Sequence, residues 1–235
     1  MMTKVESLQK QYKELIFLED SDDGIFEFKD ELLSSDDDDV LEFHFKILED
    51  KNDEYLKRDL FAFFSDRKDK VKVDEFLYEK YKKGIDNIEL RADVIQILGH
   101  LRGKHAKEVA LENIAIRKGD LRYRSIIVLG WVGSKTDLKV LNERLLTDPD
   151  PQLRGYAATA MRQIWFNHPK TKEDILKYIK EAIEKETAPE ALEGMIITAQ
   201  DLLKKKLGLK ESKYGDVTGD MEEAKIKTIE ALKSY

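Results

Sequence analysis

One short motif recurs along this chain and constrains its fold more than any other feature. The motif begins with Leu-Arg and continues with apolar residues at helical spacing, and its copies start at positions 90, 121 and 153. It therefore recurs after 31 and then 32 residues. A period of this length predicts stacked supersecondary units, because each unit buries its apolar face only against its neighbours. The residues between copies leave room for a second amphipathic segment, so each unit is predicted to be a pair of antiparallel helices.

The same pattern, followed along the chain, predicts an all-α fold: an α-solenoid of about five helical pairs over residues 36–206. We expect an N-terminal helical cap over residues 1–35, a linker over 207–219 and a C-terminal capping helix over 220–235. The helices of the pairs are expected near residues 36–49 and 53–65, 71–83 and 89–101, 104–118 and 120–132, 135–147 and 151–166, and 171–186 and 188–206.

The composition agrees with long, charged helices. Charged residues make up 38% of the 235 residues, with only 12 Gly and 4 Pro, which favours helices over sheets with many tight turns. There is no cysteine, which excludes disulfides, thiolate nucleophiles and cysteine-based metal sites. The first residues carry no uncharged apolar core of a signal peptide, and no run of 18 apolar residues follows, so a cytoplasmic protein without a membrane partner is expected.

The net charge of −7 is unevenly placed. Residues 20–50 contain thirteen acids against Lys29 and Lys46, a local net charge of −11. Such a lobe repels nucleic acid and attracts basic proteins. Two interpretations stay open: a docking surface for a basic partner, or a solvated N-terminal cap.

The repeated unit reads Leu-Arg-x-x-x-(Val/Ile/Ala)-x-x-Leu-Gly after a short acidic turn, and the pattern is clearest over residues 84–166. It resembles HEAT repeats of the phycobilisome-lyase-like type. The resemblance implies that the second helix of each pair lies on the concave side of the array, which is the usual binding surface in that family. The resemblance also suggests the activity of the bilin lyases, which attach tetrapyrroles to other proteins. The matching residues, however, belong to the scaffold and specify no tetrapyrrole pocket. DNA glycosylases also exist on helical-repeat scaffolds, but they need a basic channel that this acidic chain does not indicate.

Three arginines occupy the same place in successive repeats: Arg91, Arg122 and Arg154. Each follows acids in the preceding turn, and the resemblance implies that such arginine–acid pairs tie one repeat to the next. We expect this structural role rather than an anion-binding ladder.

One outward stripe is unusually apolar. If Leu90 and its equivalents face the core, the central repeat places Tyr123, Ile127 and Trp131 outward at i, i+4 and i+8. The competing interpretation is that these side chains pack under adjacent helices. Trp165 and Phe166 are expected in the core. The residues predicted to bind a partner are Tyr123, Arg124, Ile127, Trp131, Tyr156, Gln96 and His100.

No catalytic, cofactor-binding or metal-ligating residues are predicted, because the four histidines form no i, i+4 pair and no serine lies in a glycine elbow. The leading hypothesis is a non-enzymatic scaffold or adaptor that binds a protein, without a cofactor, on its concave face. A sharper hypothesis is an immunity or antitoxin-like inhibitor whose acidic lobe binds a basic partner. Two enzyme-like hypotheses stay open beside these: a lyase or chaperone of the bilin-lyase type, and a nucleic-acid-binding glycosylase.

Overall fold

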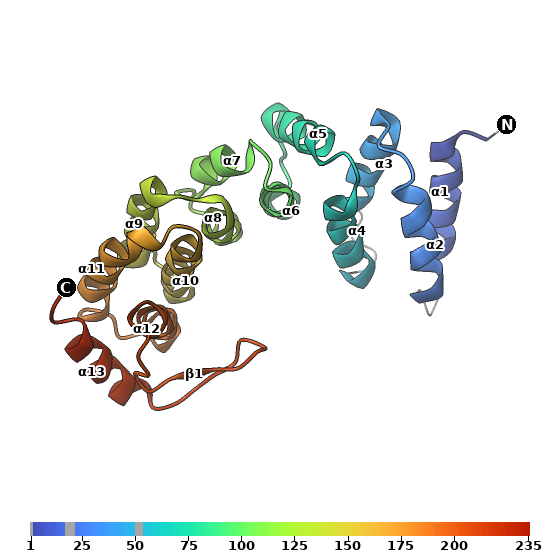
Figure 1. Cartoon of the computed structure of the whole chain (residues 1–235). Helices are drawn as coiled ribbons and strands as arrows, with labels where there is room; N and C mark the ends of the chain where they lie inside the picture. Colours follow the sequence, from blue (N-terminus) through green and yellow to red (C-terminus); the bar gives the residue numbers. More distant parts are fainter. Residues whose placement is uncertain (1, 17–21, 50–53) are drawn as a thin grey trace. The chain divides into compact units, whose positions relative to one another are not determined.

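The computed structural model describes residues 2–16, 22–49 and 54–235 (Figure 1). In these ranges the chain forms thirteen α-helices, and its only strands are those of one short hairpin. The prediction of an all-α helical-repeat solenoid is confirmed. The chain divides into two compact units, residues 1–105 (unit 1) and residues 106–235 (unit 2).

Unit 1 contains six helices in its described part. Thr3 begins the first of them with a capping box, in which its hydroxyl accepts from the Glu6 N–H and the Glu6 carboxylate accepts from the Thr3 N–H. The helices are α1 (Lys4–Leu15), α2 (Asp22–Leu32), α3 (Asp38–Leu48), α4 (Glu54–Asp66), α5 (Lys70–Lys83) and α6 (Ile88–Leu101).

Unit 2 continues with alternating shorter and longer helices and ends in a hairpin and a last helix. Its elements are α7 (Ala106–Asn113), α8 (Gly119–Val132), α9 (Leu138–Thr147), α10 (Pro151–Asn167), α11 (Lys172–Ile183), α12 (Pro189–Leu203), β1 (Lys210–Glu211), β2 (Val217–Thr218) and α13 (Met221–Ala231). Short 3₁₀ turns precede α9 at Lys135–Asp137 and α11 at Pro169–Thr171.

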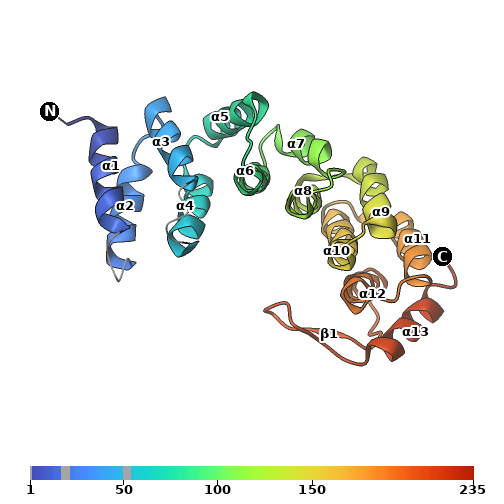
Figure 2. The ribbon, with the colours of Figure 1, turned by 180° about the vertical axis from the view of Figure 1, so that it is seen from behind.

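The helices of unit 2 form two rows. Helices α8, α10 and α12 make an inner row, on the side to which the hairpin projects, and α7, α9 and α11 make the outer row (Figures 1 and 2). Among the described elements, contacts within the inner row are the most extensive, first α10 with α12 and then α10 with α8. The motif leucines Leu121 and Leu153 anchor this row, since they are 1% and 4% exposed, and Leu192 of α12 is 1% exposed.

Proline and aspartate fix where the inner helices begin. Pro151 and Pro189 occupy first-turn positions, where the missing N–H costs no helical hydrogen bond. The Asp150 carboxylate caps α10 by accepting from the N–H of Gln152, at 2.9 Å.

Helices α10 and α12 meet backbone to backbone at two glycines. A Cβ added to Gly155 would lie 2.5 Å from the carbonyl oxygen of Glu190, and one added to Gly194 would overlap the carbonyl of Gly155. Only glycine permits this approach. Tyr156 follows the first glycine and Glu193 precedes the second, so both are held at the same crossing.

The secondary structure differs from the sequence prediction at two places in unit 2. The helix expected over 104–118 ends at Asn113, whose side-chain amide donates to the Val109 carbonyl at 2.7 Å and competes with the helical backbone. Residues 207–219, expected as a linker, include the hairpin, and both Leu207 and Leu209 are 5% exposed because they pack into the unit.

Candidate partner-binding surface

An aromatic pair lies on the inner row of unit 2, where α8 runs beside α10. The rings of Tyr123 and Tyr156 are 5.1 Å apart between centroids and inclined at 50°. Both side chains are half-buried. The Arg124 guanidinium carbon lies 5.2 Å from the centre of the Tyr123 ring, and the Gln152 amide donates to the Tyr156 hydroxyl at 3.2 Å. The pair therefore has fixed neighbours on two sides and remains accessible to solvent.

The aromatic pair continues along α8. Ile127 and Trp131 follow Tyr123 at helical spacing, and both are half-buried. Each of these side chains thus offers apolar surface outside the core without being free of protein contacts. That this stripe binds a partner stays a prediction.

The end of α10 extends the apolar surface, contrary to the sequence prediction. Trp165 and Phe166 were expected in the core, but Trp165 is half-buried and Phe166 is 62% exposed. Their rings contact each other, with centroids 5.1 Å apart. The prediction was wrong because Ile164 already fills the core position at this end of the helix, where it is fully buried.

Two of the predicted binding residues lie in unit 1 and make a separate cluster on α6. The Gln96 amide nitrogen and the His100 Nε2 are 3.3 Å apart, and the His100 ring meets the edge of Phe61 at 6.1 Å between centroids. Ala92, predicted to begin this outward stripe, is 3% exposed. Helix α6 therefore presents only the later part of the stripe.

Carboxylates flank the aromatic pair on its α12 side. Burial, and then the neighbouring charges of Glu211 and Glu190, raise the pKa of Glu193 above its usual value. Burial also raises the pKa of Tyr156, and Tyr123 and Glu193 add to that shift. Glu193 therefore lies within electrostatic reach of the aromatic pair.

The hairpin is fastened to the same surface by one arginine. Arg162 of α10 donates to Asp201 of α12 at 2.9 Å and to Glu211 of β1 at 3.0 Å. In the turn beyond β1, Tyr214 is 81% exposed. The base of the hairpin is thus fixed to two helices of the inner row while its turn faces solvent.

The repeated arginines Arg122 and Arg154 each reach forward to the next helical pair. Arg122 donates to both oxygens of Asp148 at 2.8 and 3.1 Å, and Arg154 donates to both oxygens of Glu186 at 2.6 and 3.0 Å. Each also donates to the backbone carbonyl six residues before it, of Ile116 and Asp148 respectively. Carboxylates of the preceding turn were expected as partners, but the paired carboxylates come from the following turn.

Arg91 has different neighbours. Its guanidinium carbon lies 5.4 Å from the centre of the Tyr81 ring, and its Nη2 lies 3.5 Å from the Tyr81 hydroxyl. Its Nε is buried without a hydrogen-bond partner among the described residues. The acids that precede Arg91 in the sequence, Asp86 and Glu89, were expected as its partners but are not among its contacts in the described chain.

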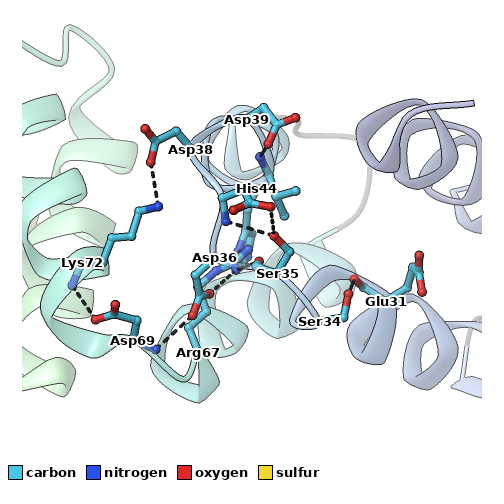
Figure 3. A network of polar contacts seen from close by, with 12 residues as sticks. Glu31, Ser34, Ser35, Asp36, Asp38, Asp39, His44, Arg67, Asp69 and Lys72 are labelled. Atoms are coloured by element: carbon cyan, nitrogen blue, oxygen red, sulfur yellow. Dashed lines mark hydrogen bonds and ion pairs between the residues drawn. The ribbon is translucent and has the colours of Figure 1, made fainter.

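A buried network organises the start of α3 in unit 1 (Figure 3). Arg67, 1% exposed, donates to the Ser35 carbonyl and to Asp36 Oδ1 at 2.9 and 2.8 Å, and to Nδ1 of the fully buried His44 at 3.0 Å. Nε2 of His44 donates to the Leu60 carbonyl at 2.8 Å. Burial, and then the charge of Arg67, hold the pKa of His44 well below 6.5, so the ring is neutral.

Several acids of the segment 20–50 are neutralised within unit 1. Besides Asp36, which binds Arg67, three others pair with lysines of the same unit. These pairs are Glu31 with Lys4, Asp38 with Lys72 and Glu42 with Lys80. The acidic lobe therefore carries less unpaired charge than its sequence indicates.

Sequence reasoning did not find Glu190, Glu193 or the hairpin contact of Arg162. Acids near the start of a helix are expected from the helix dipole alone, so nothing in the pattern distinguishes these two glutamates. Their significance comes from the packing of α12 against α10. In the described ranges no group of three or more histidine or acidic side chains could hold a metal ion, and no helix combines the length and apolarity needed to cross a membrane.

Comparison with known proteins supports the repeat. Residues 80–162 match a family model described as HEAT repeats, which supports a HEAT-repeat protein. The matched stretch runs from the end of α5 through most of α10 and includes the Tyr123–Tyr156 pair. No curated protein matches the chain.

Proposed function

We propose that this protein is a non-enzymatic scaffold or adaptor that binds a protein partner on the inner row of unit 2. The observation that carries the proposal is the half-exposed Tyr123–Tyr156 pair, continued by Ile127 and Trp131 on α8. HEAT repeats commonly serve as protein-interaction scaffolds, so the family match supports the same interpretation.

The chemistry of the surface favours a protein partner. Tyrosine, tryptophan and arginine dominate interface energetics when a partner excludes water from them. Tyr123 and Tyr156 support each other by ring contact, so little side-chain freedom is lost on binding. Arg124 adds a cationic edge to the same surface.

The direct test is affinity capture with the full chain, followed by purification of the captured protein and measurement of its affinity. The double variant Tyr123→Ala, Tyr156→Ala should weaken binding by about tenfold or more, because it removes the central rings. Tyr178→Ala on α11 is the matched control, since Tyr178 is also half-buried but lies on the outer row. Each variant is first checked for an unchanged circular dichroism spectrum. Equal affinity of the double variant and the parent would contradict the proposal.

A second candidate function is the immunity or antitoxin-like inhibitor, favoured by the excess of acids between residues 20 and 50. The internal pairs of Glu31, Asp36, Asp38 and Glu42 reduce the charge available for a basic partner, so we rank it second. The lyase, chaperone and glycosylase hypotheses gain no supporting observation from the described residues. The phycobilisome-lyase-like subtype and a cytoplasmic location remain predictions from the sequence.

A further inference from the structure

Glu193 differs from the other buried or half-buried carboxylates of unit 2. Within residues 106–235, all of which the structure describes, it alone in this set has no hydrogen-bond or ion-pair donor. The carboxylates that do have a donor are Asp137, Asp148, Asp150, Asp174, Glu186 and Asp201.

The surroundings of Glu193 add charge of the same sign. Glu190, one helical turn earlier on α12, is exposed and has no donor in the described chain, and Glu211 approaches from the hairpin. Arg162 lies close by, but its guanidinium already binds Asp201 and Glu211. A half-buried carboxylate held against like charges is stabilised by the arrival of a cation.

The aromatic pair lies next to this carboxylate. Gly155 and Gly194 pack backbone to backbone, and Tyr156 and Glu193 are the residues next to them in the sequence of α10 and α12. The charge of Glu193 acts on the Tyr156 hydroxyl, whose pKa it helps to raise, so a cation bound by Glu193 would lie within electrostatic reach of Tyr156. The other ring of the aromatic pair, Tyr123, already has the guanidinium of Arg124 near it, so the pair can accommodate a cation.

We propose that this surface recognises an arginine or lysine in a basic segment of the protein partner, with Glu193 and Glu190 accepting from the cation and Tyr156 providing a ring beside it. The inference rests on the proposed function and adds the chemistry of the bound segment. Charge complementarity selects the occupant: the unpaired carboxylates repel an acidic peptide or a phosphate, whereas a basic side chain supplies the missing donors.

The test uses a defined peptide, acetyl-Arg-Gly-Arg-Gly-Arg-amide, titrated into the full chain and followed by NMR. The matched peptide carries citrulline in place of arginine, which keeps the shape and removes the charge. We expect the arginine peptide to shift resonances of Tyr123, Tyr156 and α12, and to bind at least about fivefold more tightly than the citrulline peptide.

Two double variants locate the effect. Glu190→Gln with Glu193→Gln should weaken binding of the arginine peptide by about fivefold or more, since it removes the accepting charge. Glu181→Gln with Glu184→Gln, at the end of α11, has the same spacing and charge change but lies on the outer row, and it should change the affinity by less than about twofold.

The outcomes separate this inference from the proposed function. Failure of the arginine peptide to bind at about 10 mM, equal binding of the citrulline peptide, or equal effects of the two double variants each overturn the inference. If a captured partner loses affinity with the tyrosine variant but not with Glu190→Gln, Glu193→Gln, the proposed function stands and the basic segment is wrong. If neither variant affects the partner, both are wrong.

Discussion

The Leu-Arg motif has two structural outcomes in this molecule, one in unit 2 and one in unit 1. In α8 and α10 of unit 2 the arginine forms a two-point ion pair with a buried carboxylate of the next helical pair. In α6 of unit 1, Arg91 lies against the ring of Tyr81. An identical motif therefore gives a buried charge pair in one unit and a cation–π contact in the other.

The partner of the arginine in unit 2 lies outside the motif. Asp148 and Glu186 each lie two residues before the N-cap of an inner helix, Asp150 and Ala188 respectively. In unit 2 the ion pair between repeats thus joins an arginine of one repeat to an acid in the turn that begins the following inner helix.

The largest effect is expected for Arg122→Ala. Its side chain is 7% exposed and that of Asp148 is fully buried, so the variant leaves a buried carboxylate without its main donor. We expect a loss of about 3–5 kcal/mol in the free energy of unfolding. Urea unfolding followed by circular dichroism measures it. A loss below about 1 kcal/mol would show that Asp148 finds another donor, such as Arg144. The buried ion pair of unit 2 would then stabilise the fold no more than the cation–π contact of unit 1.

Arg154→Ala should cost less, about 2 kcal/mol, because its side chain is 18% exposed and Glu186 keeps two backbone donors. Burial raises the pKa of Glu186, but the hydrogen bonds from Arg154 and from the N–H groups of Ala188 and Thr187 outweigh it, and the net pKa lies below 4.5. A lowered carboxyl pKa stabilises the fold above 4.5, and that contribution is lost as the pH falls below this value. Urea unfolding of the variant at pH 7 and pH 3 should therefore show a smaller loss of stability on acidification than in the parent.

Unit 1 should respond to acid at a higher pH than this region of unit 2. The pKa of His44 is lowered in the folded chain, so its neutral form stabilises the fold above the unfolded value of 6.5, and this contribution falls as the pH drops below it. The expected loss is about 1.4 kcal/mol per pH unit until the folded pKa is reached. Hydrogen exchange at pH 7 and pH 5, corrected for intrinsic rates, should show lost protection in α3 and α4. Unchanged protection there would contradict the assignment of a neutral ring to His44, whose contacts are drawn in Figure 3.

Arg91→Ala should have the smallest effect, about 1 kcal/mol or less, because it removes a cation–π contact and leaves no buried carboxylate without its donor. A double-mutant cycle with Tyr81→Leu sharpens the comparison, since leucine keeps apolar bulk and removes the ring. We expect a coupling of about 0.5–1 kcal/mol between positions 81 and 91, measured by urea unfolding. If the two changes are strictly additive, the Tyr81 ring does not stabilise the Arg91 guanidinium. The motif arginine of unit 1 would then have no stabilising contact to set against the ion pairs of unit 2.

The sequence was sufficient to predict the all-α helical-repeat fold, because the apolar period and the turn residues indicate the same succession of helices, although the helix expected over 104–118 ends at Asn113. It placed Arg122 and Arg154 in matching positions but not their partners, since Asp148 and Glu186 lie 26 and 32 residues later and only folding brings them close. The surface around Glu193 could not be predicted for the same reason. Phe166 was misassigned because hydrophobicity alone does not distinguish a core ring from an exposed one.

The contact of Gly155 with Gly194 has a mechanical consequence for recognition. Side chains between two helices can change rotamer and let the helices slide, but at Gly155 and Gly194 main chain meets main chain without a side chain between. The spacing of the two backbones that carry Tyr156 and Glu193 is thus set by main chain, and only side-chain rotamers adjust the distance from ring to carboxylate. A ligand therefore meets two helices that are already fixed against each other, and only side chains remain to be ordered when it binds.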